Sequence, residues 1–272
     1  MKTILAPTDF SEASQNAVNY AAELAKFTHA RLIIFHGYSV PVPVSEVPVV
    51  AIPFEDLEKE NMKLLHDLDK KIKHDYGKIE THLVTMPGFV VDEIMSMLLS
   101  HKADIVVMGL TGAGRTAALL GSNTTSVMKR APVPVLAVPE KAKFKKPAKI
   151  ALACDYKAII PDQAVKSFKE FVRLFGSKVL VFDVLKKAEL VSYQKAAAEV
   201  NLENALGDME HALYFPSSDN LSEEVNRFVE NNNVDLLTVM PHNYTFISRL
   251  FHHSLAKKIA LHTHVPILSI HE

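Results

Sequence analysis

The stretch MGLTGAGRTAALLGSNT, residues 108–124, decides the fold because it sets a glycine-rich loop between a strand and a helix. The apolar residues 105–108 form a run that is typical of a buried parallel strand. A second apolar run follows at 133–138. Glycine permits positive φ and lets another chemical group come close to the main chain. The stretch contains four glycines, Gly109, Gly112, Gly114 and Gly121.

A phosphate group suits such a loop. Gly121 and Ser122 open the next helix, so unpaired N–H groups and the positive end of the helix dipole point into the loop. A tight turn alone needs one glycine, and the four found here favour an anion site over a plain turn. The sequence therefore predicts a phosphate-binding loop after the strand.

Length and composition limit the classes of protein to which the chain can belong. With 272 residues it is long enough for two domains, and its 48% of hydrophobic residues supports packed cores. The net charge of −1 gives no field that attracts nucleic acid or an anionic membrane. A single cysteine, Cys154, rules out an internal disulfide framework and fits a reducing compartment. No apolar run approaches the roughly 18 residues of a spanning helix, and no signal-peptide core precedes Asp9, so we expect a cytoplasmic location.

Strands and helices alternate along the first half of the chain. Ser11 is expected to cap the first helix, whose apolar positions fall on one face. The expected strands are 2–6, 31–35, 79–85, 104–108 and 133–138, and the expected helices are 12–26, 55–76 and 91–99. This alternation predicts a parallel sheet covered by helices on both faces.

The pattern then begins again, which indicates an internal repeat. The segments 149–155, 178–182, 234–239 and 265–270 match 2–9, 31–35, 103–108 and 133–138 in the same order. The cationic segment 140–147 separates the two copies, and we interpret it as a solvated tether in preference to an anion-binding patch. The sequence thus predicts two domains, 1–140 and 147–272.

These motifs resemble the universal stress protein family, here as a tandem of two family domains. The resemblance rests on ILAPTDFS at 4–11, on APVPV at 131–135 and on the glycine loop with its closing Gly121–Ser122 pair. It implies an α/β fold of two repeated five-stranded parallel-sheet domains, strand order 3-2-1-4-5, Rossmann-like and similar to adenine nucleotide alpha-hydrolases. In members that bind ATP or AMP, the nucleotide lies at the carboxyl ends of strands 1 and 4. A doubly wound sheet reverses direction there and leaves a crevice.

Carried over to this chain, the resemblance implies a nucleotide site in the first domain. Pro7, Thr8 and Asp9 would border the base and ribose, although Asp9 could also be a plain carboxylate favoured by the helix dipole. Gly37, just past the second strand, would line the adenine side. The other candidates would lie under the nucleotide or contact its phosphates: Met108, Gly109, Gly112, Gly114, Arg115, Gly121, Ser122 and Asn123. For Arg115, pairing with a phosphate and a place on the surface are both open.

Both glycine loops depart from the family pattern. Eight residues, 113–120, separate the second and third motif glycines of the first loop, whereas the matching segment of the second repeat, 244–252, has nine. The first loop is therefore one residue short, which affects phosphate geometry and not the fold. In the second repeat Met240, Asn243 and His253 replace the motif glycines, and a Cβ at each would obstruct a phosphate. We expect that domain to be degenerate, serving a structural role or another ligand.

Histidines gather near the end of the chain, but their pattern does not favour a metal site. His252 and His253 are adjacent, and His262 and His264 alternate, so neighbouring rings would point in different directions on a helix. Neither a cysteine nor an HExxH motif accompanies them. We expect no metal ligands here.

Three functions remain open. The first is a non-catalytic or weakly catalytic stress or regulatory protein that binds ATP or AMP in its first domain, with or without Mg²⁺. The second is a slow ATPase. The sequence argues against it, because it contains neither a G-x-x-x-x-G-K-[ST] loop nor an evident catalytic residue. The third is an interaction scaffold without nucleotide, for an unknown protein partner.

The last strands of the two repeats, 133–138 and 265–270, are expected at sheet edges. Exposed apolar edges invite pairing, and the resemblance implies antiparallel contact between family domains. The short linker would keep the two domains together at high effective concentration. We therefore expect an intrachain pseudo-dimer, and association of two chains into a homodimer is left open.

Overall fold

The computed structural model describes residues 1–39, 54–110, 121–153, 161–183, 200, 202–216, 218, 221–240 and 265–270. The strands are β1 (Thr3–Pro7), β2 (Arg31–Tyr38), β3 (Thr81–Pro87), β4 (Ile105–Gly109), β5 (Val135–Val138), β6 (Lys149–Ala153), β7 (Lys178–Phe182), β8 (His211–Tyr214), β9 (Leu236–Val239) and β10 (Ile267–Ser269). The helices are α1 (Glu12–Thr28), α2 (Phe54–Tyr76), α3 (Val90–Ser100), α4 (Ser122–Arg130), α5 (Asp162–Phe175) and α7 (Leu221–Asn232). The expected elements of the first half agree with these bounds to within a few residues.

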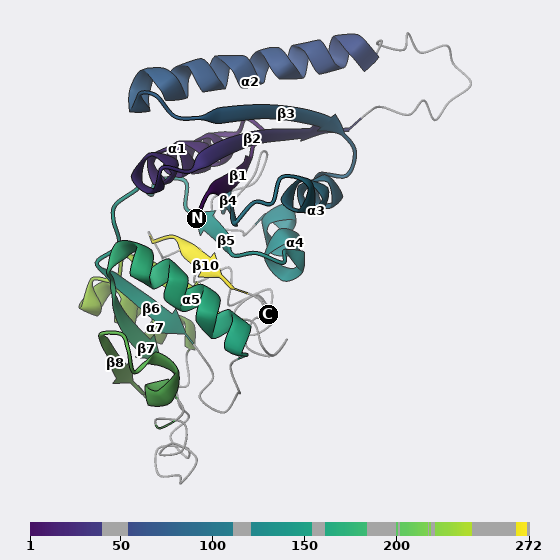
Figure 1. The fold of residues 1–272 in the computed structure, drawn as a ribbon. Helices are drawn as coiled ribbons and strands as arrows, with labels where there is room; N and C mark the ends of the chain where they lie inside the picture. Colours follow the sequence, from purple (N-terminus) through teal and green to yellow (C-terminus); the bar gives the residue numbers. More distant parts are fainter. Residues whose placement is uncertain are drawn as a thin grey trace.

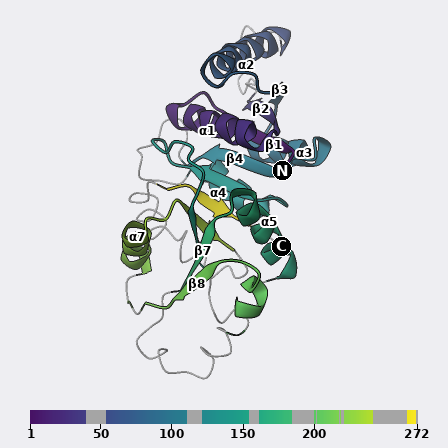
Figure 2. The same cartoon turned by 60° about the vertical axis from the view of Figure 1, so that its left-hand side comes forward.

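Ten strands form one sheet, in the order β3-β2-β1-β4-β5-β10-β9-β6-β7-β8. Within each half the neighbouring strands are parallel. Both halves follow the expected order 3-2-1-4-5, because β8-β7-β6-β9-β10 repeats the arrangement of the first five strands. Figures 1 and 2 show the long helix α2 and strand β3 at one end of the molecule, with β8 toward the other end.

The two halves meet along one seam. There β5 and β10 pair antiparallel, with Leu136 opposite Leu268 and Val135 opposite Ser269. The antiparallel edge contact expected for the last strands is thus present. The ten strands form a single sheet, so the division into two domains stays a prediction.

Alternation along the strands builds a core on each face of the sheet. On β1, Ile4 and Ala6 belong to the core that includes α1, α2 and α5, whereas Leu5 belongs to the core that includes α3, α4 and α7. Each core continues across the seam, since Phe168 of α5 joins the first and Phe228 of α7 joins the second. Among the described helices, none combines the length and apolar character that crossing a bilayer would require.

The segment 140–147 is packed against the protein, which corrects its interpretation as a solvated tether. The side-chain amide of Asn16, on α1, donates to the carbonyls of Pro139 at 2.9 Å and Ala142 at 2.8 Å. Ala142 is buried. Lysines dominate the composition of this segment, but the apolar residues between them decide where it lies.

An aromatic cluster joins the linker to both halves. Phe144 meets Tyr20 edge-on, with ring centroids 5.3 Å apart, and lies 6.0 Å from Phe27, which is also on α1. Phe27 in turn stacks on Phe175 of α5 at 5.4 Å. The linker ring therefore contributes to the contact between the first helices of the two halves.

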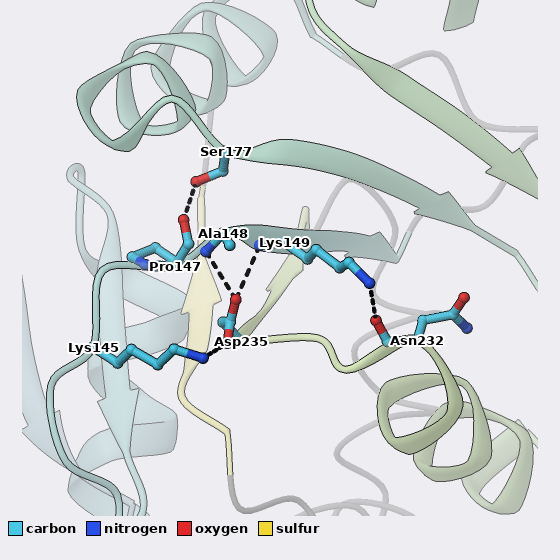
Figure 3. Close-up of polar contacts among 7 residues, drawn as sticks. All are labelled: Lys145, Pro147, Ala148, Lys149, Ser177, Asn232 and Asp235. Carbon is cyan, nitrogen blue, oxygen red and sulfur yellow. Dashed lines mark hydrogen bonds and ion pairs between the residues drawn. The ribbon is translucent and has the colours of Figure 1, made fainter.

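Asp235, just before β9, holds the end of the linker (Figure 3). Its carboxylate accepts hydrogen bonds from the main-chain N–H groups of Ala148 at 2.8 Å and Lys149 at 3.0 Å. The ammonium of Lys145 lies 3.0 Å from the other carboxylate oxygen. These contacts fix the point at which the linker becomes β6.

Candidate functional site

The carboxyl ends of β1 and β4 lie side by side. The strands pair through Ile4 with Ile105 and Leu5 with Val106, and this register brings Pro7 level with Met108. From β1 the chain continues to β2 on one side, while β4 occupies the other side. A parallel sheet leaves a crevice at such a switch point.

Thr8 follows β1 and is held entirely by protein contacts. Its N–H donates to the Phe35 carbonyl at 2.8 Å, and its hydroxyl lies 3.0 Å from both the Ser14 hydroxyl and the Phe10 N–H. Its own carbonyl accepts from Nδ1 of His36 at 2.8 Å. Thr8 is buried, so it shapes the end of β1 and offers the crevice little polar surface.

Asp9 is exposed at the same edge and is tied to the start of α1. Its Oδ1 accepts from the N–H of Ser11 at 3.1 Å and from the Ser11 hydroxyl at 2.5 Å. Ser11 is the N-cap of α1, as expected, and its hydroxyl accepts from the Ser14 N–H at 3.3 Å. Asp9 therefore lies at a helix start, where the dipole favours a carboxylate, and also at the rim of the crevice.

The start of α4 lies at the end of β4. The N–H of Gly121 donates to the carbonyl of Leu110, the residue after the strand, at 2.8 Å. Within the described part of the chain, no side chain caps the helix at Gly121. Within the described residues no acceptor is found for the N–H groups of Ser122 and Asn123, and both residues are exposed. Of the predicted donors, Ser122 and Asn123 are thus available, whereas Gly121 is already engaged.

Thr124 locks this helix start in place. It is buried, and its hydroxyl donates to the carbonyl of Gly109 at 2.8 Å. Gly109 ends β4, and Met108, the residue before it, is buried, so both lie at the carboxyl end of this strand. The predicted site residues Gly112, Gly114 and Arg115 lie outside the described residues.

Gly37 lies inside β2, which corrects its expected place just past the strand. β2 continues to Tyr38 alongside β3, and its last main-chain bond comes from the N–H of Gly88 to the Tyr38 carbonyl. Toward β1 the pairing ends at Phe35, whose carbonyl accepts from Thr8. Main-chain groups alternate along a strand, so the N–H and C=O of Gly37 face the side where β1 has already ended.

His36 was missed by sequence reasoning, although it is the first polar residue after the apolar run of β2. Its ring lies 4.5 Å from that of Phe10 and 6.4 Å from that of Tyr38. Phe10 has φ 61°, a left-handed conformation that is uncommon for such a residue. Burial, followed by the charge of Glu58, raises the pKa of Tyr38, so its hydroxyl stays neutral.

The described residues of the site supply hydrogen-bond donors and acceptors. Among the residues that the structure describes, no group of three or more His, Cys, Asp or Glu side chains comes together as metal ligands. The four histidines considered above as metal ligands, at positions 252, 253, 262 and 264, lie outside that part of the chain. What the crevice offers is main-chain N–H and C=O groups and one exposed carboxylate.

Known proteins resemble this chain in sequence and in fold. The profile of the universal stress protein family matches residues 1–139. A universal stress protein of Methanocaldococcus jannaschii is 34% identical over 157 residues, which cover 54% of this chain and 84% of the relative. A universal stress protein from Thermus aquaticus is 31% identical over 139 residues, which cover 50% of this chain and 98% of that relative.

Similarity of fold extends over the whole chain. The crystal structure of a universal stress protein from Archaeoglobus fulgidus superimposes with a TM-score of 0.75 at 18% identity, covering 99% of this chain and 98% of that one. The family profile covers half of the chain, and the fold similarity covers both halves. The chain belongs to the universal stress protein family.

Proposed function

We propose that the first half binds an adenine nucleotide, ATP or AMP, at the carboxyl ends of β1 and β4, and that the protein acts as a nucleotide sensor in stress regulation. The observation that carries this proposal is the uncapped start of α4. Among the described residues the N–H groups of Ser122 and Asn123 have no acceptor, and the helix dipole adds a partial positive charge. Such a helix start at a switch point is suited to phosphate.

The exposed edge of β2 complements the base. Adenine carries a donor at N6 and an acceptor at N1 beside it. Gly37 presents one main-chain N–H and one C=O toward the space beyond β1, so a single residue supplies both partners. Asp9 follows β1, which lies between β2 and β4 in the sheet. Its carboxylate can accept hydrogen bonds from ribose hydroxyls.

Binding fits the site better than catalysis. The sequence has no G-x-x-x-x-G-K-[ST] loop, whose lysine and hydroxyl hold phosphates and Mg²⁺ in P-loop enzymes. Asp9, the exposed carboxylate at the rim, is already bonded through one oxygen to Ser11. Slow hydrolysis is therefore the alternative, and steady-state phosphate release from ATP distinguishes it from sensing.

Ser122→Pro tests the proposal at a single atom. Proline is tolerated at the first position of a helix and lacks only the N–H. Gly121 has φ −59° and ψ 141°, the conformation that a residue before proline requires. We expect binding of ATP or AMP to weaken about tenfold to a hundredfold, because one hydrogen bond to a charged group is worth about 1.5–3 kcal/mol.

Ser122→Ala is the matched control, since it removes the hydroxyl and keeps the N–H. Isothermal titration with ATP, AMP and GTP measures each affinity. Equal affinities for Ser122→Pro and the wild type would contradict a phosphate at α4, and equal affinities for ATP and GTP would contradict recognition of adenine. Mass spectrometry of ligand released from protein purified without added nucleotide identifies which nucleotide is retained.

A further inference from the structure

The hydrogen-bond ladder between β1 and β2 stops before the end of β2. Its last rung joins the Thr8 N–H to the Phe35 carbonyl at 2.8 Å. In a parallel pair the next rung would join the Gly37 N–H to the Thr8 carbonyl. That rung is missing among the described residues, although β2 itself stays extended to Tyr38.

A side chain takes the place of the missing rung. Nδ1 of His36 lies 2.8 Å from the Thr8 carbonyl oxygen. Because a carbonyl only accepts, Nδ1 must carry the proton. His36 thus donates to the carbonyl oxygen to which the main-chain N–H of the following residue would donate in a continued ladder.

Packing holds both partners of this bond. The His36 ring is bracketed by Phe10, at 4.5 Å, and by Tyr38, whose ring plane is only 15° from that of the imidazole. Thr8 is fixed through its N–H and through its hydroxyl, which meets Ser14 and Phe10. The ring contact with Phe10 and the hydrogen bonds of Thr8 therefore help to keep the imidazole and the carbonyl together.

We propose that His36 is a positioning residue for the nucleotide site: its imidazole terminates the β1–β2 ladder and keeps the main-chain N–H of Gly37 unpaired for the adenine base. This inference rests on the proposed function, because the freed N–H is the group assigned there to N1 of adenine. It also has a consequence that needs no nucleotide. With an apolar side chain at position 36, the Thr8 carbonyl is released and the Gly37 N–H can close the ladder.

Amide hydrogen exchange in the absence of nucleotide tests the ladder directly. In the wild type, the Gly37 amide should exchange at least about tenfold faster than the paired Phe35 amide. In His36→Leu, the Gly37 amide should become protected to a similar degree as Phe35. In His36→Asn, where the amide nitrogen occupies the place of Nδ1 on the side chain, exchange should remain fast. Equal exchange of Gly37 in all three proteins would overturn the proposal.

Titration with AMP tests the link to binding. His36→Leu should weaken AMP about tenfold or more, and His36→Asn should restore most of the affinity. His74→Leu, an exposed histidine on α2, is the matched control and should change neither measurement. Unchanged affinity in His36→Leu would overturn the positioning role. Failure of the wild type to bind any adenine nucleotide would overturn the proposed function, while the exchange data would still decide what His36 does to the ladder.

Discussion

Asp104 and Asp235 occupy equivalent places in the two halves of the sheet. Oδ2 of Asp104 accepts from the main-chain N–H groups of Lys2 and Thr3, and Oδ2 of Asp235 accepts from those of Ala148 and Lys149. Each carboxylate therefore precedes the fourth strand of its half and clamps the start of the first strand. The correspondence between the two halves thus extends to polar contacts as well as to the order of the strands.

Asp235→Ala should lower the free energy of unfolding by about 1.5–3 kcal/mol, the range for hydrogen bonds to a charged group. Burial raises the pKa of Asp235, but hydrogen bonds from Lys149, Lys145 and Ala148 outweigh it, and the net pKa is lowered. The stabilisation is therefore present above the unfolded pKa of about 3.9 and is lost as pH falls through the folded pKa. Urea unfolding at pH 7 and at pH 3 measures both effects.

Asp104→Ala is the comparison for this variant. Asp104 is exposed and has no lysine partner among the described residues, so its loss should cost less than that of Asp235. A larger loss for Asp104→Ala would mean that the linker contacts of Asp235 contribute little.

The alternation of strands and helices and its repetition in the second half followed from the apolar pattern of the sequence, whereas the strand order and the antiparallel seam were implied by the family resemblance. Three features followed from neither. The extent of β2 depends on tertiary pairing with β3, which carries the strand past Phe35 to Tyr38. The Thr8 carbonyl is bonded to the ring of His36, and the position of His36 in the sequence does not indicate this contact. The packed linker depends on Phe144, a single ring among lysines.

Phe144→Ala should destabilise the contact between the halves. The ring is partly buried and meets Tyr20 and Phe27, so the cost should be about half that of a core phenylalanine, about 2 kcal/mol. Phe144→Leu keeps apolar contact and should lose less. Chemical unfolding measures both, and equal stability of Phe144→Ala and the wild type would show that the aromatic cluster does not stabilise the fold.

Stability should fall between neutral and mildly acidic pH because of His101. Burial, then the neighbouring His82 and Arg31, lower the pKa of His101. The unfolded chain binds the proton more readily, so stability is fully present above about pH 6.5 and decreases below it until the folded pKa is passed. His101→Gln should flatten this part of the pH profile of thermal unfolding. An unchanged slope in His101→Gln would contradict the assignment.

Titration should give one equivalent of adenine nucleotide per chain. The second half carries Asn243 and His253 where the first loop has glycines, and both positions lie outside the described residues. Gly112→Val, in the first loop and also outside them, should abolish binding and leave the fold intact, since it changes loop geometry and not the core. Two equivalents, or binding unaffected by Gly112→Val, would contradict a site confined to the first half.

Lengthening the first glycine loop should tighten binding. Its segment 113–120 has eight residues and the matching segment 244–252 has nine, and neither lies within the described part of the chain. If the loop wraps the phosphates, one missing residue removes or misplaces one N–H donor, which costs about one to two decades in Kd. Gly114 partly compensates by letting the shorter loop turn without strain, so the wild-type Kd should be nearer micromolar than nanomolar.

One serine inserted between Ala113 and Gly114 restores the spacing, and calorimetry should show a lower Kd. The same insertion in the second loop should change nothing. Weaker binding after the first insertion would mean that the eight-residue loop is adapted to its ligand and is no defect.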